Sequence, residues 1–190
     1  TDPFDGSVGY KIPMVEADIV TVSHEHYDHN YVEGIQGEPE VIRSAGECAI
    51  DGINIKGVPA FHDEAKGAKR GPNIIFVFEI DGLRICHLGD LGHLLSKSQL
   101  EEIGDIDVLL IPIGGTFTVN AEGALAVIDQ ISPKIVIPMH YKTPAVSMPI
   151  DPVDKFVEKI GNAERIDSNT IEITPETLGD ERRVIILNYE

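Results

Sequence analysis

The chain has 190 residues, 42% of them hydrophobic and 25% charged, a balance typical of a globular protein with a buried core. Its net charge of −17 argues against a nucleic-acid partner, because phosphates call for a basic groove. No stretch approaches the ~20 apolar residues that span a bilayer, so no membrane partner is expected. The length predicts one domain over residues 1–190.

Two further features bear on processing of the chain and on the compartment in which it works. The first residues, Thr1-Asp2-Pro3-Phe4, form neither a signal peptide nor a natural start, so the chain looks processed or truncated. Cys48 and Cys86 are too few for a disulfide framework and lack CxxC spacing. They predict buried reduced thiols in a cytoplasmic protein.

The first half of the chain predicts strands joined by tight turns. Residues 17–23 form a β-branched run that ends in polar residues, as a buried strand feeding a loop does. Two Asp-Gly pairs stand between alternating apolar residues, which is a strong hairpin signal. The predicted hairpins turn at 51–52, joining 49–50 to 53–55, and at 81–82, joining 74–80 to 83–88.

The second half alternates helices and strands. Asn120 can cap a helix that runs to about Ile131, and Asp151-Pro152 places a proline at the first position of another helix. We also expect a helix at 96–103 and strands at 107–111, 134–137, 170–174 and 183–187. Pro112 is predicted to stop the strand at 107–111, and Pro138 the strand at 134–137. Hairpins followed by alternation predict a layered α/β domain.

Three of the seven histidines fall in one string, His24-Glu25-His26-Tyr27-Asp28-His29, directly after the first predicted strand. In an extended segment the side chains of residues 24, 26 and 28 share a direction, and a turn can swing His29 toward a second centre. Imidazoles and carboxylates suit divalent ions such as Zn²⁺. A polar loop rich in histidine by chance is the alternative, but such clustering is rare outside metal sites.

His62, Asp90 and His140 each stand a few residues past an apolar, strand-like run. Singly, each would be interpreted as a turn or capping residue. Because each could project from the same rim of the sheets, together with the string they complete seven ligands. Seven ligands are enough for two ions that share one carboxylate.

This order of motifs closely resembles the metallo-β-lactamase superfamily over roughly residues 1 to 145. Four segments resemble the branch that contains the L-ascorbate-6-phosphate lactonase and uncharacterised prokaryotic relatives: Gly71-Pro72-Asn73, His87-Leu88-Gly89-Asp90, Ile111-Pro112-Ile113-Gly114-Gly115 and Pro138-Met139-His140-Tyr141. The resemblance implies a four-layer αββα sandwich with the metal site at one edge of the two sheets. Such members usually begin before the position of Thr1, so N-terminal strands are expected to be missing.

The resemblance also implies roles for the ligands. His24, His26 and His62 would hold the first metal, Asp28, His29 and His140 the second, and Asp90 would bridge both. Two divalent ions, zinc foremost with manganese or iron as alternatives, could share a water and lower its pKa, so that the bridging hydroxide is the nucleophile. Asp28 would also accept a hydrogen bond from that water, which makes Asp28 and Asp90 the catalytic carboxylates.

The predicted activity is therefore metal-dependent hydrolysis of a small, anionic metabolite, through a lactone, amide or phosphoester bond. Asn73, Tyr141 and Lys142 are candidate substrate contacts, although turn chemistry alone would explain Asn73 and a surface position would explain Lys142.

Other polar residues have weaker expectations. Glu25 and Asp63 could orient imidazoles, with solvent exposure the favoured interpretation of both. His87 is predicted to be a packed core histidine, and a proton-shuttle role for His93 is a hypothesis.

Three other functions stay open. A nuclease or phosphodiesterase of the same superfamily is disfavoured by the acidic charge and by the lack of a long insertion. A di-iron redox enzyme is disfavoured because His26 stands where those relatives typically carry Glu. A metal-binding protein without turnover is disfavoured because a structural zinc needs only four ligands. The oligomeric state is not predicted.

Overall fold

The computed structural model describes residues 1–189, which form strands, α-helices and short 3-10 turns. The strands are β1 (Ile19–Thr21), β2 (Glu40–Ile42), β3 (Gly46–Ile50), β4 (Ile53–Phe61), β5 (Pro72–Ile80), β6 (Leu83–His87), β7 (Val108–Pro112), β8 (Ile135–Met139), β9 (Glu164–Arg165) and β10 (Arg183–Ile186). The α-helices are α1 (Lys97–Ile103), α2 (Ala121–Ile131) and α3 (Val153–Ile160).

One large mixed sheet organises the molecule, with strand order β3-β4-β5-β6-β7-β8-β10-β9. β3 to β6 are antiparallel neighbours, whereas the pairs from β6 onward are parallel. Because β4 and β6 are both antiparallel to β5, they run in the same direction as β7 and β8. The carboxyl ends of β4, β6, β7 and β8 therefore meet at one edge. β1 and β2 form a separate parallel pair.

Both predicted Asp-Gly hairpins are confirmed. Asp51 and Gly52 have φ of 51° and 83°, and Asp81 and Gly82 have φ of 51° and 77°. A two-residue hairpin turn of type I′ requires positive φ at both central residues, which Asp tolerates and Gly adopts freely. The turns place Ile50 opposite Ile53 and Ile80 opposite Leu83.

The predicted helices are confirmed, and local caps explain where they begin. The Ser96 Oγ accepts a hydrogen bond from the Gln99 N–H at 3.3 Å, and the Gln99 side chain accepts one from the Ser96 N–H at 3.0 Å. Asn120 Oδ1 accepts a hydrogen bond from the Gly123 N–H at 3.0 Å at the start of α2. α3 begins at Val153, one residue later than predicted, because Pro152 is its extended N-cap.

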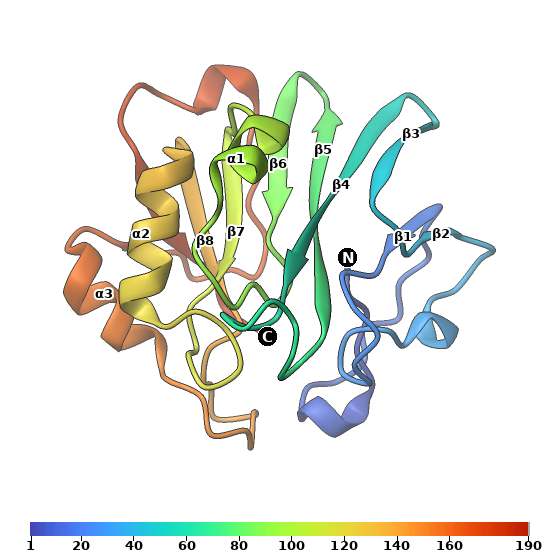
Figure 1. Cartoon of the computed structure of the whole chain (residues 1–190), viewed down its shortest axis with the longest axis horizontal. Helices are drawn as coiled ribbons and strands as arrows, with labels where there is room; N and C mark the ends of the chain where they lie inside the picture. Colours follow the sequence, from blue (N-terminus) through green and yellow to red (C-terminus); the bar gives the residue numbers. More distant parts are fainter. Residues whose placement is uncertain (190) are drawn as a thin grey trace.

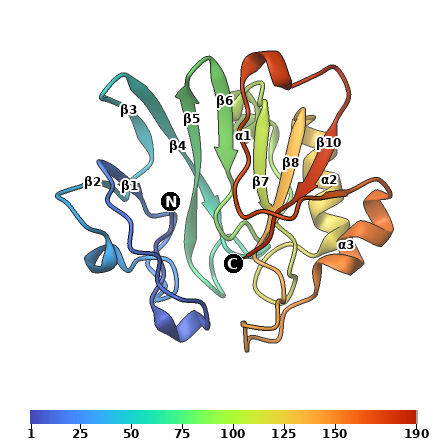
Figure 2. The ribbon, with the colours of Figure 1, turned by 180° about the vertical axis from the view of Figure 1, so that it is seen from behind.

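Helices cover one face of the large sheet, and a second core cluster covers the other face over β6, β7, β8 and β10. All three helices pack against the same core cluster, which includes Phe156, Leu109 and Val136. Val108 and Ile135 directly precede Leu109 and Val136 in β7 and β8. They point to the second cluster on the opposite face, because side chains alternate along a strand. Figures 1 and 2 show the helices on one face and the C-terminal segment crossing the other.

The prediction of a strand at residues 170–174 is wrong. The edge of β10 is paired instead with β9, which was not predicted. Ile171 and Ile173 nevertheless pack against the second core cluster, so the alternating pattern comes from a segment that covers the sheet without joining it.

β7 ends at Pro112, as predicted, whereas β8 continues past Pro138 to Met139, which corrects the prediction that Pro138 stops it. Both prolines belong to the last residue pairs of the β7–β8 ladder, where Ile111 is opposite Pro138 and Pro112 is opposite Met139. β10 pairs with β8 only at Ile135 and Val136, so Pro138 lies beyond that ladder and its missing N–H is not required there.

Cys86 is buried as predicted, but Cys48 is exposed, which corrects the expectation for that thiol. Cys48 lies in β3 at the end of the sheet, where no further strand of the described chain covers it. Among residues 1–189, no helix has the length and apolar character that crossing a bilayer would require.

Phe156 tests the packing of α3 on the sheet. Its side chain is fully buried in the larger core cluster, so Phe156→Ala should lower the free energy of unfolding by ~3–5 kcal/mol. Urea unfolding at fixed metal concentration measures this difference. Glu158→Ala, an exposed position on the same helix, is the control and should change the free energy by less than about 0.5 kcal/mol. Equal effects of the two substitutions would contradict this packing.

Candidate metal centre

The shared edge of the large sheet brings the scattered ligand candidates together. His62 follows β4, Asp90 follows β6 and His140 follows β8, and these three strands end at that edge. The string at 24–29 reaches the same place from β1 in the small sheet. The seven residues predicted to be ligands are therefore neighbours in space.

Asp90 lies at the centre of this group. Its Oδ2 is 3.1 Å from His62 Nε2, 3.5 Å from His140 Nε2, 3.6 Å from His29 Nε2 and 3.9 Å from His24 Nε2. One carboxylate oxygen thus faces imidazoles from four different chain positions.

The ligand candidates form two principal groups whose donor atoms all lie within 4.8 Å of one another. One consists of His24, His26 and His62, and the other of His29, Asp90 and His140. Asp28 stands at the side of the second group, with Oδ2 3.9 Å from His29 Nε2. These two groups follow the division that the resemblance implies, whereas a third group of equally close donor atoms, Asp2, His24 and His29, spans it.

Asp2 and Ser23 orient two of the imidazoles, and sequence analysis missed both. Asp2 accepts hydrogen bonds from the Ser23 N–H at 2.7 Å and the Ser23 hydroxyl at 2.6 Å, and its Oδ2 lies 3.3 Å from His29 Nδ1. The Ser23 hydroxyl proton is directed at Asp2, so Ser23 Oγ accepts from His24 Nδ1 at 2.9 Å. Both rings are then left with Nε2 free for a metal.

Glu25 and Asp63 do not contact the imidazoles. Glu25 is exposed, as predicted, and pairs with Arg43 at 2.9 Å. Asp63 is buried, which corrects its predicted exposure. Its carboxylate accepts hydrogen bonds from backbone N–H groups of Ala65, Gly67, Lys69 and Arg70, and so shapes the loop after His62.

Asn73 holds the turn that carries Asp90. Its side chain is 1% exposed; Nδ2 donates to the Leu88 carbonyl at 2.9 Å, and Oδ1 accepts from the Asp90 N–H at 2.9 Å. Gly89, between them, has φ of 54°, and a Cβ there would overlap Asn73 Oδ1 and Ser23. Only glycine permits this close approach.

Tyr141 and Lys142 point to different places. Tyr141 is half-buried and lines a cavity that opens beside the second group of ligands. Burial raises the pKa of its phenol. Lys142 turns its ammonium away into the loop that follows, where it donates to the carbonyl of Met148 at 2.9 Å and to that of Val146. The amine is thus committed to shaping that loop.

The remaining two histidines are held by local backbone groups. His87 is buried as predicted, and burial lowers its pKa to about 4. Its Nδ1 accepts from the Gly89 N–H at 3.2 Å. His93 Nε2 accepts from the Phe61 N–H at 3.1 Å, and its Nδ1 lies 2.7 Å from the Leu94 carbonyl. Both ring nitrogens of His93 are occupied, which argues against a proton shuttle.

Burial and charge set the protonation of the centre. Burial, helped by the nearby His29, lowers the pKa of His24 to about 3, so this ring is neutral at pH 7. Burial works against a charge on His29, but the carboxylates of Asp90 and Asp2 outweigh it and raise its pKa to about 9. Burial similarly opposes the charge on Asp90, yet His140 and His29 hold its pKa below the usual range.

The donor set fits divalent cations. Four buried polar atoms of the centre have no hydrogen-bond partner among residues 1–189, namely His24 Nε2, His62 Nδ1, His140 Nδ1 and Asp90 Oδ1. Coordination to a metal would satisfy His24 Nε2 and Asp90 Oδ1, which offsets the free energy that their burial costs; His62 and His140 face Asp90 with Nε2, so a metal there would leave their Nδ1 atoms as they are. Mixed imidazole and carboxylate donors suit zinc, manganese or iron.

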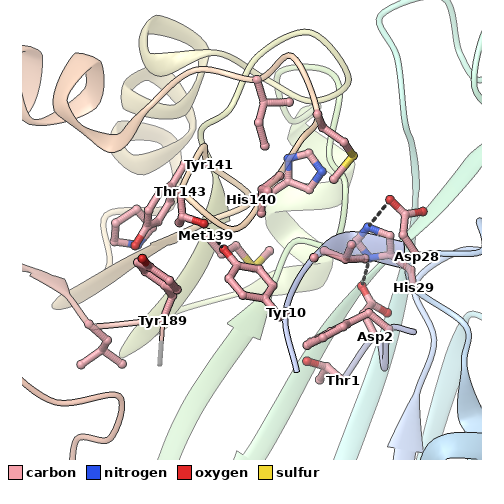
Figure 3. A pocket seen from close by; sticks show the side chains of 18 of the residues that line it. Thr1, Asp2, Tyr10, Asp28, His29, Met139, His140, Tyr141, Thr143 and Tyr189 are labelled. Carbon is pink, nitrogen blue, oxygen red and sulfur yellow. Dashed lines mark hydrogen bonds and ion pairs between the residues drawn. The ribbon is translucent and has the colours of Figure 1, made fainter. Parts of the chain in front are cut away.

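A cavity of about 1020 Å³ opens beside the second group of ligands. Asp28, His29, Asp90 and His140 form part of its wall, and Figure 3 shows His29 between the carboxylates of Asp28 and Asp2. A small molecule in this cavity can therefore reach the candidate metal centre.

Comparison with known proteins identifies the family. Residues 1–140 match the family model described as the Beta-lactamase superfamily domain. The crystal structure of a Thermotoga maritima protein assigned to the Zn-dependent hydrolases of the metallo-β-lactamase superfamily is 43% identical. It covers 98% of this chain and 87% of its own, with a TM-score of 0.83. The chain belongs to the metallo-β-lactamase superfamily.

Curated relatives support the same conclusion. A metal-dependent hydrolase of Pelotomaculum thermopropionicum is 33% identical over 161 residues, covering 70% of this chain and 71% of the relative. One of Thermococcus onnurineus is 30% identical over 194 residues, covering 87% and 85%. The predicted superfamily, its fold and metal-dependent hydrolysis are confirmed.

Proton release on metal binding tests the charge of His29. A metal ligand must be a neutral imidazole, and with a pKa of about 9 the free His29 carries a proton at pH 7. Zn²⁺ added to the chelator-treated protein at pH 7 should therefore displace about one proton from His29. Its apparent affinity should rise with pH and level off above about 9. Calorimetry in buffers of different ionisation enthalpy measures the release, and a pH-independent affinity would contradict this assignment.

Proposed function

We propose that the chain is a binuclear hydrolase. In this proposal His24, His26 and His62 hold one divalent cation, and Asp28, His29 and His140 hold the other, with Asp90 between them. The observation that carries it is the position of Asp90 Oδ2, 3.1 Å from His62 of the first group and 3.5 Å from His140 of the second. Zinc is the proposed metal, with manganese or iron as alternatives.

Such a centre supports hydrolysis without a serine or cysteine nucleophile. When bound, the two cations would supply hydroxide near neutral pH and stabilise the oxyanion of the transition state. Asp28 lines the cavity next to His29, where its carboxylate can accept a hydrogen bond from the attacking water. Asp2 and Ser23 would keep His29 and His24 in the orientation that directs Nε2 at a metal.

The proposed substrate is a small molecule that enters the cavity and carries a lactone, amide or phosphoester bond. We place the whole activity in one domain over residues 1–190. Tyr141 is the proposed substrate contact, because its side chain lines the cavity. Lys142 and Asn73 have their polar atoms engaged by backbone groups, so we assign them positioning roles in place of contacts.

Substitution of Asp90 tests the binuclear centre. Asp90→Ala should lose at least one metal equivalent by elemental analysis, because the shared carboxylate is gone. Activity against a panel of lactones, thioesters and phosphodiesters should fall by more than about a hundredfold, beyond the loss typical of removing an outer partner of a ligand. Asp180→Ala, in an exposed loop, is the control and should keep metal and activity. Full metal content and activity in the Asp90 variant would rule out the proposal.

Substitution of Asn73 distinguishes a role in positioning Asp90 from a direct contact with substrate. Because its amide fixes the Asp90 turn, Asn73→Ala should weaken metal retention by ~10–100-fold, with activity restored by excess metal. Metal affinity is measured by competition with a chromogenic chelator. A variant with unchanged metal affinity and a raised KM would show instead that Asn73 contacts substrate.

A further inference from the structure

We propose that the substrate is an uncharged carboxylic ester, lactone or amide with an aromatic or alkyl body. This inference rests on the proposed function and narrows it, and it replaces the anionic metabolite that the sequence predicted. It depends on the walls of the cavity of about 1020 Å³, on their charges and on how they are held together.

The walls away from the ligands are largely apolar. They come from three separate segments: residues 4–13, residues 137–150 in the last part of β8 and the loop that follows it, and residues 187–189. Aromatic rings join the first and third segments, since Tyr10 lies 6.0 Å from Phe4 and 5.7 Å from Tyr189 between ring centroids. Figure 3 shows Tyr10 between Tyr189 and the His29–Asp28 pair. The second segment contributes mainly aliphatic and thioether groups, such as Met139, Val146, Met148 and Ile150.

The lining of the cavity is poor in cations that could bind an anionic substrate. Asp2, Asp28 and Asp90 supply carboxylates, whereas Lys11, which is exposed, is the only Lys or Arg among the described residues that line the cavity. The nearby Lys142 has turned its ammonium to the carbonyls of Val146 and Met148. Two divalent cations would carry four positive charges, which three carboxylates and the attacking hydroxide balance. A phosphate or carboxylate on the substrate body would therefore find only the exposed Lys11 as an opposite charge in the lining, in a chain of net charge −17.

The cavity is large enough for a body beyond the scissile bond. Ligand sites commonly span ~300–1,000 Å³, so a carbonyl at the metal centre would fill only a small part of this one. The Tyr10 and Thr143 hydroxyls are 2.7 Å apart and join the walls contributed by residues 4–13 and 137–150. Gly9 packs directly against the Ala145 carbonyl, where a Cβ would overlap it. These contacts form the cavity before substrate binds, and burial of an apolar body in it is favourable.

In the reaction water adds to the acyl group, the acyl C–O or C–N bond breaks, and the oxygen of water remains in the carboxylic acid. One proton of water passes to the leaving alcohol or amine, and the acid loses its own at neutral pH. The product carboxylate then replaces the consumed hydroxide in the charge balance with Asp2, Asp28 and Asp90.

A matched pair of esters tests the inference with the metal-loaded protein. Phenyl butyrate and the phenyl monoester of succinic acid share a leaving group and differ mainly by one carboxylate at the chain end. We expect kcat/KM for phenyl butyrate to exceed that for the succinate ester by at least about tenfold, the least that a mismatched group in a pocket costs. Equal or reversed preference would overturn the inference, and so would cleavage of bis(p-nitrophenyl) phosphate without cleavage of either ester. In each case the proposal that the chain is a binuclear hydrolase would stand, and only the inference about its substrate would fail.

Binding supplies a readout that does not depend on turnover. Saturation-transfer NMR should show that the metal-loaded protein binds 4-phenylbutan-2-one and not its para-carboxylated counterpart. If no ester, lactone or phosphodiester were cleaved, the proposed function would fail, and this binding preference would still decide the character of the cavity. Preferred binding of the carboxylated ketone would overturn the inference.

A charge placed in the wall gives a second, independent test. Tyr189→Lys introduces an ammonium at a partly exposed wall position, and should lower the ratio of phenyl butyrate to succinate-ester kcat/KM about tenfold, equivalent to ~1.4 kcal/mol. Leu94→Lys, at an exposed position outside the described cavity lining, adds the same charge as a control and should leave the ratio unaltered. An unchanged ratio in the Tyr189 variant, or the same shift in both, would show that this wall does not bind the substrate body.

Discussion

The arrangement around Asp90 is the constraint on which the rest of the centre depends. Its buried carboxylate faces nitrogens of His62, His140, His29 and His24 at 3.1 to 3.9 Å, while its other oxygen has no partner among the described residues. A buried charge in such a position is tolerated only when opposite charge compensates it. Asn73 and the close-packed Gly89 fix the turn that holds the carboxylate there, so part of the interior is devoted to placing one side chain.

The fold supplies the convergence, and the local sequence supplies the chemistry. β4, β6 and β8 run in the same direction, so the residues that follow them reach one edge although they lie far apart in the chain. The small sheet brings the 24–29 string to that edge from the other side. This combination agrees with membership of a superfamily of metal-dependent hydrolases. The scaffold itself does not fix a substrate, because one fold hosts many reactions.

The proposed neutral substrate is consistent with the charges of an acidic chain around a metal centre. The positive charge of two cations would be balanced by three carboxylates and the attacking hydroxide, and the nearby lysine, Lys142, is directed into its own loop. Recognition of the substrate body is then left to the shape and apolar character of the walls. Tyr10, Tyr189 and Met148 come from segments that meet only in the folded chain. Selectivity and catalysis are thus assigned to different parts of the same cavity.

The sequence by itself determined those features that arise from neighbouring residues. The Asp-Gly turns, the Asn120 cap and the spacing of the 24–29 string depend on interactions across a few positions, so they could be predicted. The placement of His62, Asp90 and His140 could be predicted from their positions after strands and from resemblance. Only the tertiary structure decided that Asp2 supports His29, that Asn73 and Lys142 turn to backbone groups, and that residues 170–174 cover the sheet without pairing. Each of these depends on competition among long-range partners, and local periodicity and side-chain type carry no information about which partner wins.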